Sequence, residues 1–266
     1  MKGRLILMDT PKQTVSLFSE TLELTITDAG AGQVFLILHG GAGPSSVAGL
    51  AGALSKSGRI VAPTHPGFDG TSRPDRFTRI DDLVLAYLAL IQQLDLTDVV
   101  VVGNSIGGWI AAEMALRKSP RVAGIVLMNA VGIDTGSAER TITNPMAVSP
   151  AERAALAFHD PGRFSIAPSS PEALAVMLEN QRVLRIYAGE HFMHDPTLRP
   201  RLAQMETPAL VVWGESDRIV DVDYGRLFAD SIPHSRFEAV AEAGHFPHIE
   251  QLDTVAGLIS DFAKGL

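Results

Sequence analysis

The feature that most constrains the fold is residues 99–109, where an apolar run passes directly into a Gly-x-Ser-x-Gly turn and then into a helical pattern. Four consecutive valines open the segment, which is typical of a parallel strand covered on both faces. Gly103 and Gly107 flank Ser105, because a reversal this tight would drive a Cβ into the neighbouring backbone. We therefore predict a strand, a sharp turn that holds Ser105 at the edge of a sheet, and a helix over residues 106–118.

The rest of the chain alternates apolar strands with amphipathic helices. Residues 14–18 and 21–27 alternate apolar and polar side chains, which predicts antiparallel strands at a sheet edge. Strands that alternate with helices predict parallel β-α-β units, so we expect an α/β fold with eight strands. The other predicted strands are residues 34–38, 59–62, 124–128, 209–213 and 236–240, and the other predicted helices are residues 47–57, 79–94, 224–231 and 251–263.

The alternation breaks between Val131 and Glu206, where no continuous apolar strand occurs. Two helix starts lie here, each with a capping serine followed by proline: residues 149–152, which also form a capping box, and residues 170–172. A segment of this length is too long for a plain loop. We predict a helical cap over residues 133–205, inserted in a core made of residues 1–132 and 206–266.

Composition excludes several classes of protein. The net charge is −8, with no basic cluster, which argues against a nucleic-acid partner. Cysteine is absent, so neither disulfides nor thiolate catalysis is available. Residues 1–8 carry too few apolar side chains for a signal peptide, and no apolar stretch is long enough to span a membrane. We expect a cytoplasmic protein with a small-molecule substrate and no membrane partner, and we leave open whether it is a monomer or a homodimer.

A nucleophilic serine needs a base and an acid, and both must follow strands that end at the same edge of the sheet. Asp217 lies four residues beyond the strand that ends at Trp213, and His245 follows the last strand. The order serine, aspartate, histidine therefore predicts that Ser105 is the nucleophile, His245 the base and Asp217 the acid. Glu215 and Asp134 are alternative acids, His248 is an alternative base, and a glycine-rich turn with an incidental serine remains an alternative to the whole triad.

An oxyanion formed by attack on a carbonyl needs two backbone N–H donors. Ile106, at the start of the helix after Ser105, is one candidate. The other is Gly41 or Ala42, in the glycine-rich turn after residues 34–38. For contacts with the substrate we predict a further set of side chains, although His39 has a bracing role as its alternative: His39, Phe68, Trp109 and Phe246.

These motifs, taken together, resemble the α/β-hydrolase family. They are His39-Gly-Gly-Ala-Gly, Gly103-Asn-Ser-Ile-Gly-Gly, Gly214-Glu-Ser-Asp and Gly244-His-Phe, in that family's order. The resemblance covers roughly residues 15–132 and 206–264. It implies a mostly parallel eight-stranded sheet with helices on both faces, and a variable cap at the position of the insertion.

Some branches of that family have an aspartate nucleophile at this turn. Because this chain has Ser105 there, it does not resemble those branches. The resemblance implies a serine hydrolase that cleaves a small carboxylic ester or lactone. Carbon–carbon bond hydrolases of the meta-cleavage type are similar, but they usually have Trp after the catalytic His and an Arg-x-Trp in the cap, whereas Phe246 follows His245 and neither Trp109 nor Trp213 lies in the insertion. A non-catalytic small-molecule receptor, and a cofactor-free lyase or oxygenase that uses His245 as base, are further alternatives.

We expect no cofactor, because the glycine-rich turns match neither the Gly-x-Gly-x-x-Gly pattern of dinucleotide sites nor the Gly-Lys-Ser/Thr pattern of P-loops. We also expect no metal. The spacing of His191, His194 and Asp195 is more typical of cap packing than of ligation. Arg182 and Arg185 could bind an acidic substrate, but exposed or ion-paired helix arginines are the simpler interpretation.

Overall fold

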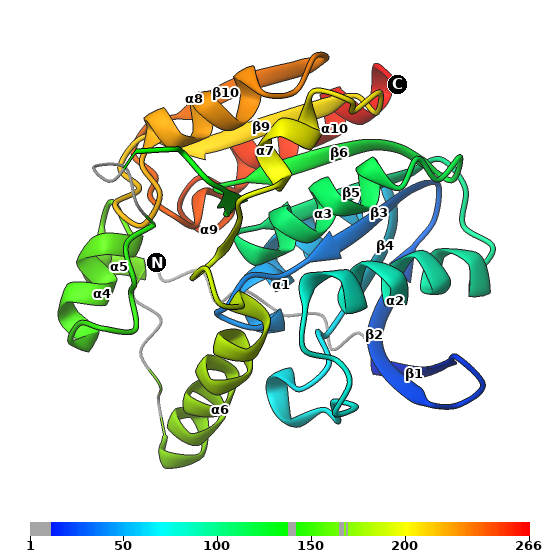
Figure 1. The fold of residues 1–266 in the computed structure, drawn as a ribbon, viewed down its shortest axis with the longest axis horizontal. Coiled ribbons are helices and arrows are strands. Elements are labelled where there is room, and N and C mark those ends of the chain that lie inside the picture. Colours follow the sequence, from blue (N-terminus) through cyan, green and yellow to red (C-terminus); the bar gives the residue numbers. More distant parts are fainter. Residues whose placement is uncertain (1–11, 138–141, 165–167, 169) are drawn as a thin grey trace.

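The computed structural model describes residues 12–137, 142–164, 168 and 170–266 (Figure 1). Residues 1–8, on which the expectation about a signal peptide rests, lie outside the described residues. Within the described part of the chain, no helix has the length and apolar character needed to cross a membrane.

An eight-stranded sheet forms the centre of the molecule, as predicted, in the order β1-β2-β4-β3-β5-β6-β9-β10. The edge strands β1 and β2 pair antiparallel, β2 also pairs antiparallel with β4, and every later neighbour is parallel. The strands are β1 (Lys12–Leu17), β2 (Leu22–Gly30), β3 (Gln33–Leu38), β4 (Gly58–Pro63), β5 (Val99–Asn104), β6 (Val122–Met128), β9 (Ala209–Gly214) and β10 (Ser235–Val240).

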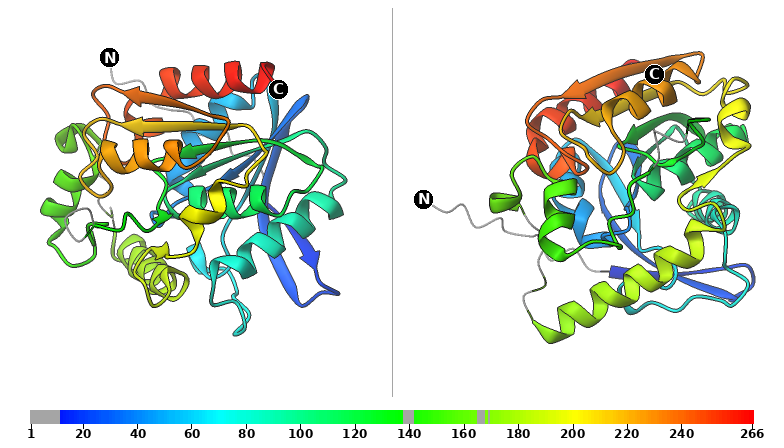
Figure 2. Two further views of the ribbon diagram at one scale, coloured as in Figure 1. Left: turned by 45° about the horizontal axis from the view of Figure 1, so that its top comes forward. Right: turned by 60° about the vertical axis from the view of Figure 1, so that its left-hand side comes forward.

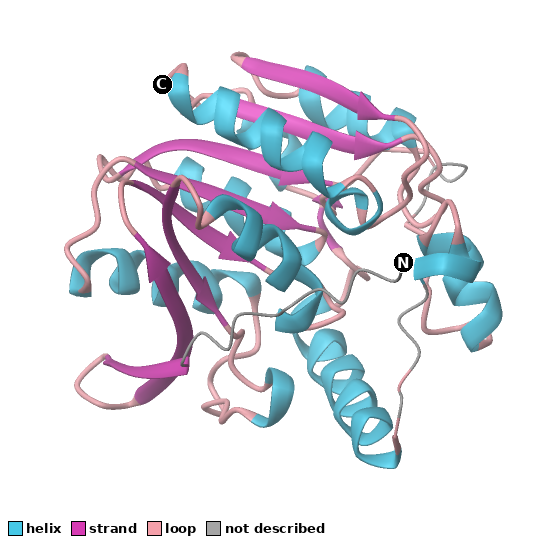
Figure 3. Ribbon diagram, turned by 180° about the vertical axis from the view of Figure 1, so that it is seen from behind, coloured by secondary structure: helices cyan, strands magenta, loops and turns pink. Residues whose placement is uncertain are grey.

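Helices cover both faces of this sheet. On one face lie α1 (Ala48–Leu54) and α10 (Leu252–Lys264), which stand in front of the sheet in Figure 3. The other face carries α2 (Ile80–Gln93), α3 (Ile106–Leu116) and α8 (Val222–Asp230). The valines of β5 alternate between the two cores: Val99 and Val101 face α2 and α3, while Val100 and Val102 face α1 and α10. The unbroken apolar run is thus explained by burial on both sides.

Three helices of the inserted segment lie beyond the carboxyl ends of the parallel strands (Figure 2). They are α4 (Pro150–Ala157), α5 (Pro161–Phe164) and α6 (Pro171–Ala188). Ser149 and Glu152 form the predicted capping box, and Ser170 caps α6 through the N–H of Ala173. Short turns η1 (Pro44–Val47) and η2 (Phe68–Gly70) and helix α9 (Pro247–Glu250) complete the loops at this end.

The ends of the insertion contain structure that the sequence analysis did not predict. Two-residue strands β7 (Gly132–Ile133) and β8 (His194–Asp195) pair in parallel, so the predicted boundary at residues 132/133 falls inside a strand. Helix α7 (Leu198–Leu202) packs on α3. Its Arg201 forms a bidentate ion pair with the buried Glu113 of α3 and a second pair with Asp195. This end of the insertion is therefore anchored to the core by charge.

Candidate active site

Ser105 occupies the turn between β5 and α3 in a strained backbone conformation, with φ 55° and ψ −119°. A Cβ on Gly103 would collide with the backbone of Gly107, and a Cβ on Gly107 would collide with the carbonyl of Leu38. Both glycines are thus required by close backbone approach. The structure holds Ser105 at the carboxyl edge of the sheet, where the sequence predicts it.

His245 and Asp217 are hydrogen-bonded to each other, with 2.8 Å between His245 Nδ1 and Asp217 Oδ2. The two residues come from different loops, after β10 and β9 respectively. Because a carboxylate only accepts, Nδ1 carries the proton and Nε2 of His245 is the nitrogen free to take one. This is the tautomer that a general base needs.

The Asp217 carboxylate is fully buried and accepts three further hydrogen bonds. Asn129 Nδ2 donates to Oδ2 at 2.7 Å, and the N–H groups of Ile219 and Val220 donate to Oδ1. Asn129 is a residue that the sequence analysis missed. It directly follows β6, so the rule that site residues follow strand ends could have found it.

The alternative acids and base lie elsewhere. Glu215 is exposed, and Asp134 accepts a hydrogen bond from Gly136 N–H beside a second, smaller cavity. His248 is buried with its Nε2 against the carbonyl of Ser46, and burial lowers its pKa to about 4. None of the three is hydrogen-bonded to the pair formed by His245 and Asp217.

Ser105 and His245 line the same cavity, which has a volume of about 270 Å³. Nucleophile–base hydrogen bonds are often long before substrate binds, and the hydrogen bonds of the described residues do not include one between these two side chains. The walls come from the turn after β3 that carries Gly41 and Ala42 (residues 39–43, the oxyanion turn), the loops after β6, β9 and β10, and the inserted segment. Most lining side chains are apolar: Val131, Ile142, Met146, Ala154, Ala157, Phe158, Leu174, Met177, Leu184, Phe192, Met193, Ile219 and Phe246.

Backbone donors suited to an oxyanion border this cavity. Gly41 and Ala42 line it, and Ile106 begins α3 directly after Ser105. In the part of the chain that the structure describes, the N–H groups of these three residues donate no hydrogen bond. The predicted donors are therefore available for a charge that develops next to Ser105.

A buried histidine network supports the turn that carries Gly41 and Ala42. His39 Nδ1 donates to the carbonyl of Gly40, and its Nε2 accepts the N–H of His65. His65 in turn donates from Nε2 to the carbonyl of His39 and accepts from the hydroxyl of Tyr87. Burial lowers the pKa of His39 to about 4 and lowers that of His65 as well, so both rings are neutral at pH 7.

The predicted substrate contacts divide into two groups. Phe246 lines the cavity and stacks on Phe158 of the insertion, with ring centroids 5.2 Å apart. His39, Phe68 and Trp109 do not line the cavity; Phe68 packs edge-on against His39 beneath the oxyanion turn. These three side chains are buried and do not contribute to the lining of the cavity.

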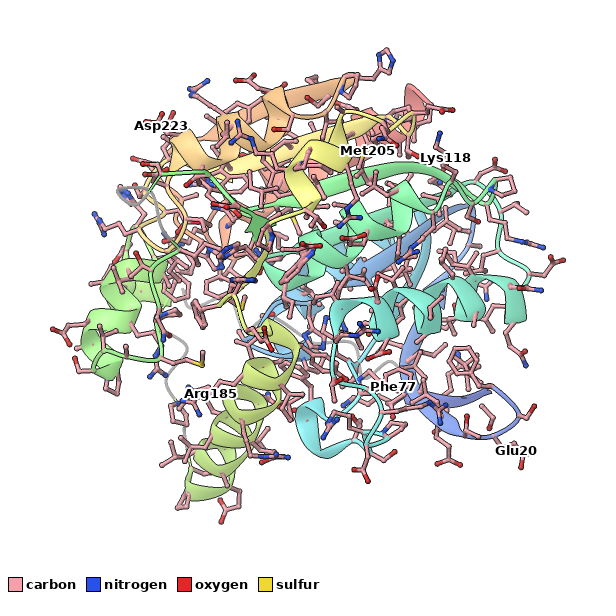
Figure 4. The ribbon with its side chains drawn as sticks, in the orientation of Figure 1. Glu20, Phe77, Lys118, Arg185, Met205 and Asp223 are labelled. Carbon is pink, nitrogen blue, oxygen red and sulfur yellow. The ribbon has the colours of Figure 1, made fainter. Side chains whose placement is uncertain are left out.

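The cap arginines named in the sequence analysis also lie outside the cavity. Arg182 is exposed and paired with Glu179 on the same helix, and Arg185 is exposed on α6, where Figure 4 labels it. The rings of His191 and His194 lie with their centroids 5.5 Å apart and their planes tilted by 36°. Among the described residues, no group of three or more His, Asp or Glu side chains is placed to hold a metal ion.

Of the described residues that line the cavity, Arg153 of α4 is the one with a Lys or Arg side chain, and the sequence analysis missed it. Its Nε donates to the carbonyl of Pro145, and no acidic side chain of the described residues pairs with it. Asn180 and Gln181 of α6 add amide groups to the lining. Arg153 could have been found from its spacing, because a helix over α4 places it on the same face as Ala154 and Ala157.

Comparison with known proteins identifies the family. The sequence model described as the alpha/beta hydrolase family matches residues 35–258, most of the chain. The chain belongs to this family. The structure has three features that the family's sequence motifs led us to expect. They are Ser105 in a tight turn between a strand and a helix, a mostly parallel sheet, and a histidine after the last strand.

Similar proteins include two curated hydrolases. The 2-hydroxymuconate semialdehyde hydrolase of Pseudomonas putida is 27% identical over 96% of this chain and 97% of its own length. The 2-hydroxy-6-oxo-6-phenylhexa-2,4-dienoate hydrolase of Burkholderia cepacia is 24% identical over 89% of this chain and 90% of its own. A bacterial membrane phospholipase A of known structure superposes with a TM-score of 0.80 at 22% identity, covering 97% of this chain and 87% of that one, which shows a shared fold.

Proposed function

We propose that this protein is a carbon–carbon bond hydrolase that acts on a 2-hydroxy-6-oxo-2,4-dienoate, with Ser105 as nucleophile, His245 as base and Asp217 as the acid that orients it. The curated relatives support this choice, because their names describe hydrolases of such dienoates and their similarity extends over most of this chain. The ester or lactone hydrolase expected from the sequence becomes the second candidate.

The proposed reaction uses groups that the cavity brings together. A carbon leaves only as a stabilised carbanion, so the 2-hydroxydienoate first shifts its hydroxyl proton to C5, which gives the 2-oxo form. Ser105 Oγ then attacks the C6 carbonyl while its proton passes to His245 Nε2. The oxyanion lies against the N–H groups of Ile106 and of Gly41 or Ala42.

The tetrahedral intermediate then collapses. The C5–C6 bond breaks, its electron pair is delocalised onto the 2-oxo group, and the proton on His245 returns to that fragment. Water, deprotonated by His245, hydrolyses the acyl group on Ser105. One water is consumed, and the products are a carboxylic acid and a five-carbon 2-hydroxydienoate.

Arg153 is the observation that carries this proposal over ester hydrolysis. Among the residues that the structure describes, no acidic side chain pairs with it, and none of those that line the cavity has a carboxylate side chain. A dienoate places its carboxylate at one end and its apolar ketone substituent at the other. The cavity offers the same division, with Arg153 for the carboxylate and apolar walls for the substituent.

One departure from the relatives' usual pattern lies among the apolar side chains of the cavity. Phe246 takes the place of the tryptophan that usually follows the catalytic histidine, and it stacks on Phe158. We infer that this aromatic pair borders the substrate beside His245. The helices α4 to α6 serve in the proposal as the cap that sets specificity.

Ester hydrolysis remains the second candidate, because the same acyl-enzyme chemistry cleaves esters and the walls away from Arg153 are apolar. Charge discriminates the two. We therefore propose to compare Arg153→Met and Arg153→Lys with the control Arg185→Met, using a 2-hydroxy-6-oxodienoate and a neutral p-nitrophenyl ester. Dienoate turnover is followed as loss of the absorbance of the conjugated system.

The Arg153→Met variant should lose about 10- to 100-fold in kcat/KM for the dienoate, as expected for removal of a charge-assisted hydrogen bond, with ester hydrolysis little changed. Arg153→Lys should lose less of its kcat/KM for the dienoate than Arg153→Met, and Arg185→Met should behave as wild type. Equal effects on both substrates, or no dienoate turnover by the wild type beside rapid ester turnover, would favour the second candidate.

A further inference from the structure

The C-terminal end of α4 is bonded directly to the loops that carry the candidate acid and base. The last carbonyls of a helix have no partner within it. Here Ala157 O accepts the N–H of His245 at 2.7 Å, and Leu156 O accepts the N–H of Arg218, the residue after Asp217, at 3.1 Å. This end of the insertion therefore contacts the His245 loop and the Asp217 loop through their main chains.

A buried carboxylate, that of Glu250, completes the junction. Its Oε2 accepts the N–H of Gly244 at 2.6 Å and that of His159 at 3.2 Å, and its Oε1 accepts the N–H of Asp160 at 3.0 Å. Gly244 immediately precedes His245, and His159 and Asp160 follow the end of α4. One side chain thus joins the His245 loop to the insertion.

The fit at this junction is close. A Cβ on Gly244 would collide with the carbonyl of Ala157, so the two backbones are in direct contact. A buried carboxylate is costly unless it is hydrogen-bonded, and Glu250 is 9% exposed. Its three N–H partners satisfy it only in this arrangement of the two segments.

We propose that Glu250 is a positioning residue for His245. By holding Gly244 and the end of α4 on one carboxylate, it fixes the His245 ring relative to Ser105 and relative to the cavity wall that bears Arg153 and Phe158. The wall formed by α4 then keeps a fixed position relative to the base. This inference rests on the proposed role of His245 as base.

The test compares Glu250→Met, which removes every acceptor, with Glu250→Gln, which can keep one oxygen on Gly244 and His159. Glu215→Met is the matched control, because Glu215 is exposed on the Asp217 loop. Turnover of the dienoate and of p-nitrophenyl acetate is measured at a temperature where thermal unfolding shows each variant to be folded. The low-field proton signal of His245 Nδ1 is recorded for the same samples.

We expect Glu250→Met to lower kcat by about 10- to 100-fold for both substrates, as for a small misplacement of a reacting group, with KM changed less than about threefold. The His245 signal should broaden or disappear. Glu250→Gln should recover most of kcat, and Glu215→Met should match wild type. If Glu250→Met does not fold, Glu250→Asp takes its place; its carboxylate is too short to reach both segments, so its kcat should fall below that of Glu250→Gln.

A folded Glu250→Met protein with wild-type kcat and a sharp His245 signal would overturn the inference. So would a Glu250→Asp variant more active than Glu250→Gln. Failure of the proposed function is recognised separately, by turnover that persists in Ser105→Ala, whatever the Glu250 variants show.

Discussion

Acidification should destabilise this protein through histidines that are buried in the neutral form. His39 and His248 are both buried, and their burial lowers each pKa from 6.5 to about 4. Between these values the unfolded chain binds a proton at each site and the folded protein does not. The stability that the neutral rings provide is therefore complete above pH 6.5 and is lost as the pH falls toward 4.

The size of the effect follows from the two pKa values. At pH 5, proton uptake by the unfolded chain costs about 2 kcal/mol of folding stability for each histidine, relative to pH 8. The pair together should lower the free energy of unfolding by about 4 kcal/mol, a large share of the total for an ordinary domain. His65, whose pKa burial also lowers, acts in the same direction.

Urea unfolding at pH 8 and pH 5 measures this difference, and His248→Gln isolates one site. Gln can donate to the carbonyl of Ser46, as His248 Nε2 does, but it does not titrate. We expect this variant to lose about 2 kcal/mol less than wild type between the two pH values, while the control His234→Gln, on an exposed side chain, changes nothing. An unchanged pH dependence in His248→Gln would refute the reasoning.

Two further substitutions test the site itself. Asp217→Asn should lower kcat by about 10⁴-fold, because the amide favours the wrong tautomer of His245; steady-state kinetics with Glu215→Gln and Asp134→Asn as controls checks this, and a larger loss in either control would move the acid to that residue. Gly107→Ala should abolish turnover and lower Tm by several degrees, because its methyl group would collide with the carbonyl of Leu38. Thermal unfolding and activity are measured on the same sample. A fully active Gly107→Ala would contradict the close packing described for the turn that carries Ser105.

The central sheet could be predicted because its signals are local. Four successive valines indicate a strand buried on both faces, and serine followed by proline indicates where α4 and α6 begin. The order of the strands in the sheet and the pairing of β7 with β8 could not be predicted. Two-residue strands have no periodicity in the sequence. The pairing of β7 with β8 forms only when Gly132 meets His194 from the far end of the insertion.

The candidate site divides along the same line. Ser105, Asp217 and His245 could be predicted because each follows a buried strand at one edge of the sheet. The roles proposed for Arg153 and Glu250 depend on which way each side chain points after α4 has packed against the core. Sequence places a residue in a loop or on a helix but does not give that direction.

The same limit applies to the predicted substrate contacts. His39 and Phe68 lie in the expected loops, but their side chains are buried away from the cavity lining. The proposed substrate, as distinct from the proposed reacting groups, rests on the relatives' names and on the position of Arg153.

Turnover of a 2-hydroxy-6-oxodienoate by Ser105→Ala, compared with wild type, tests the central claim most directly. The substitution removes the proposed nucleophile and leaves the cavity, Arg153 and the proposed oxyanion donors in place, so the variant should still bind the dienoate. We expect its kcat to fall by at least roughly 1,000-fold. Turnover close to the wild-type rate in a correctly folded Ser105→Ala protein would contradict the assignment of Ser105 as the nucleophile.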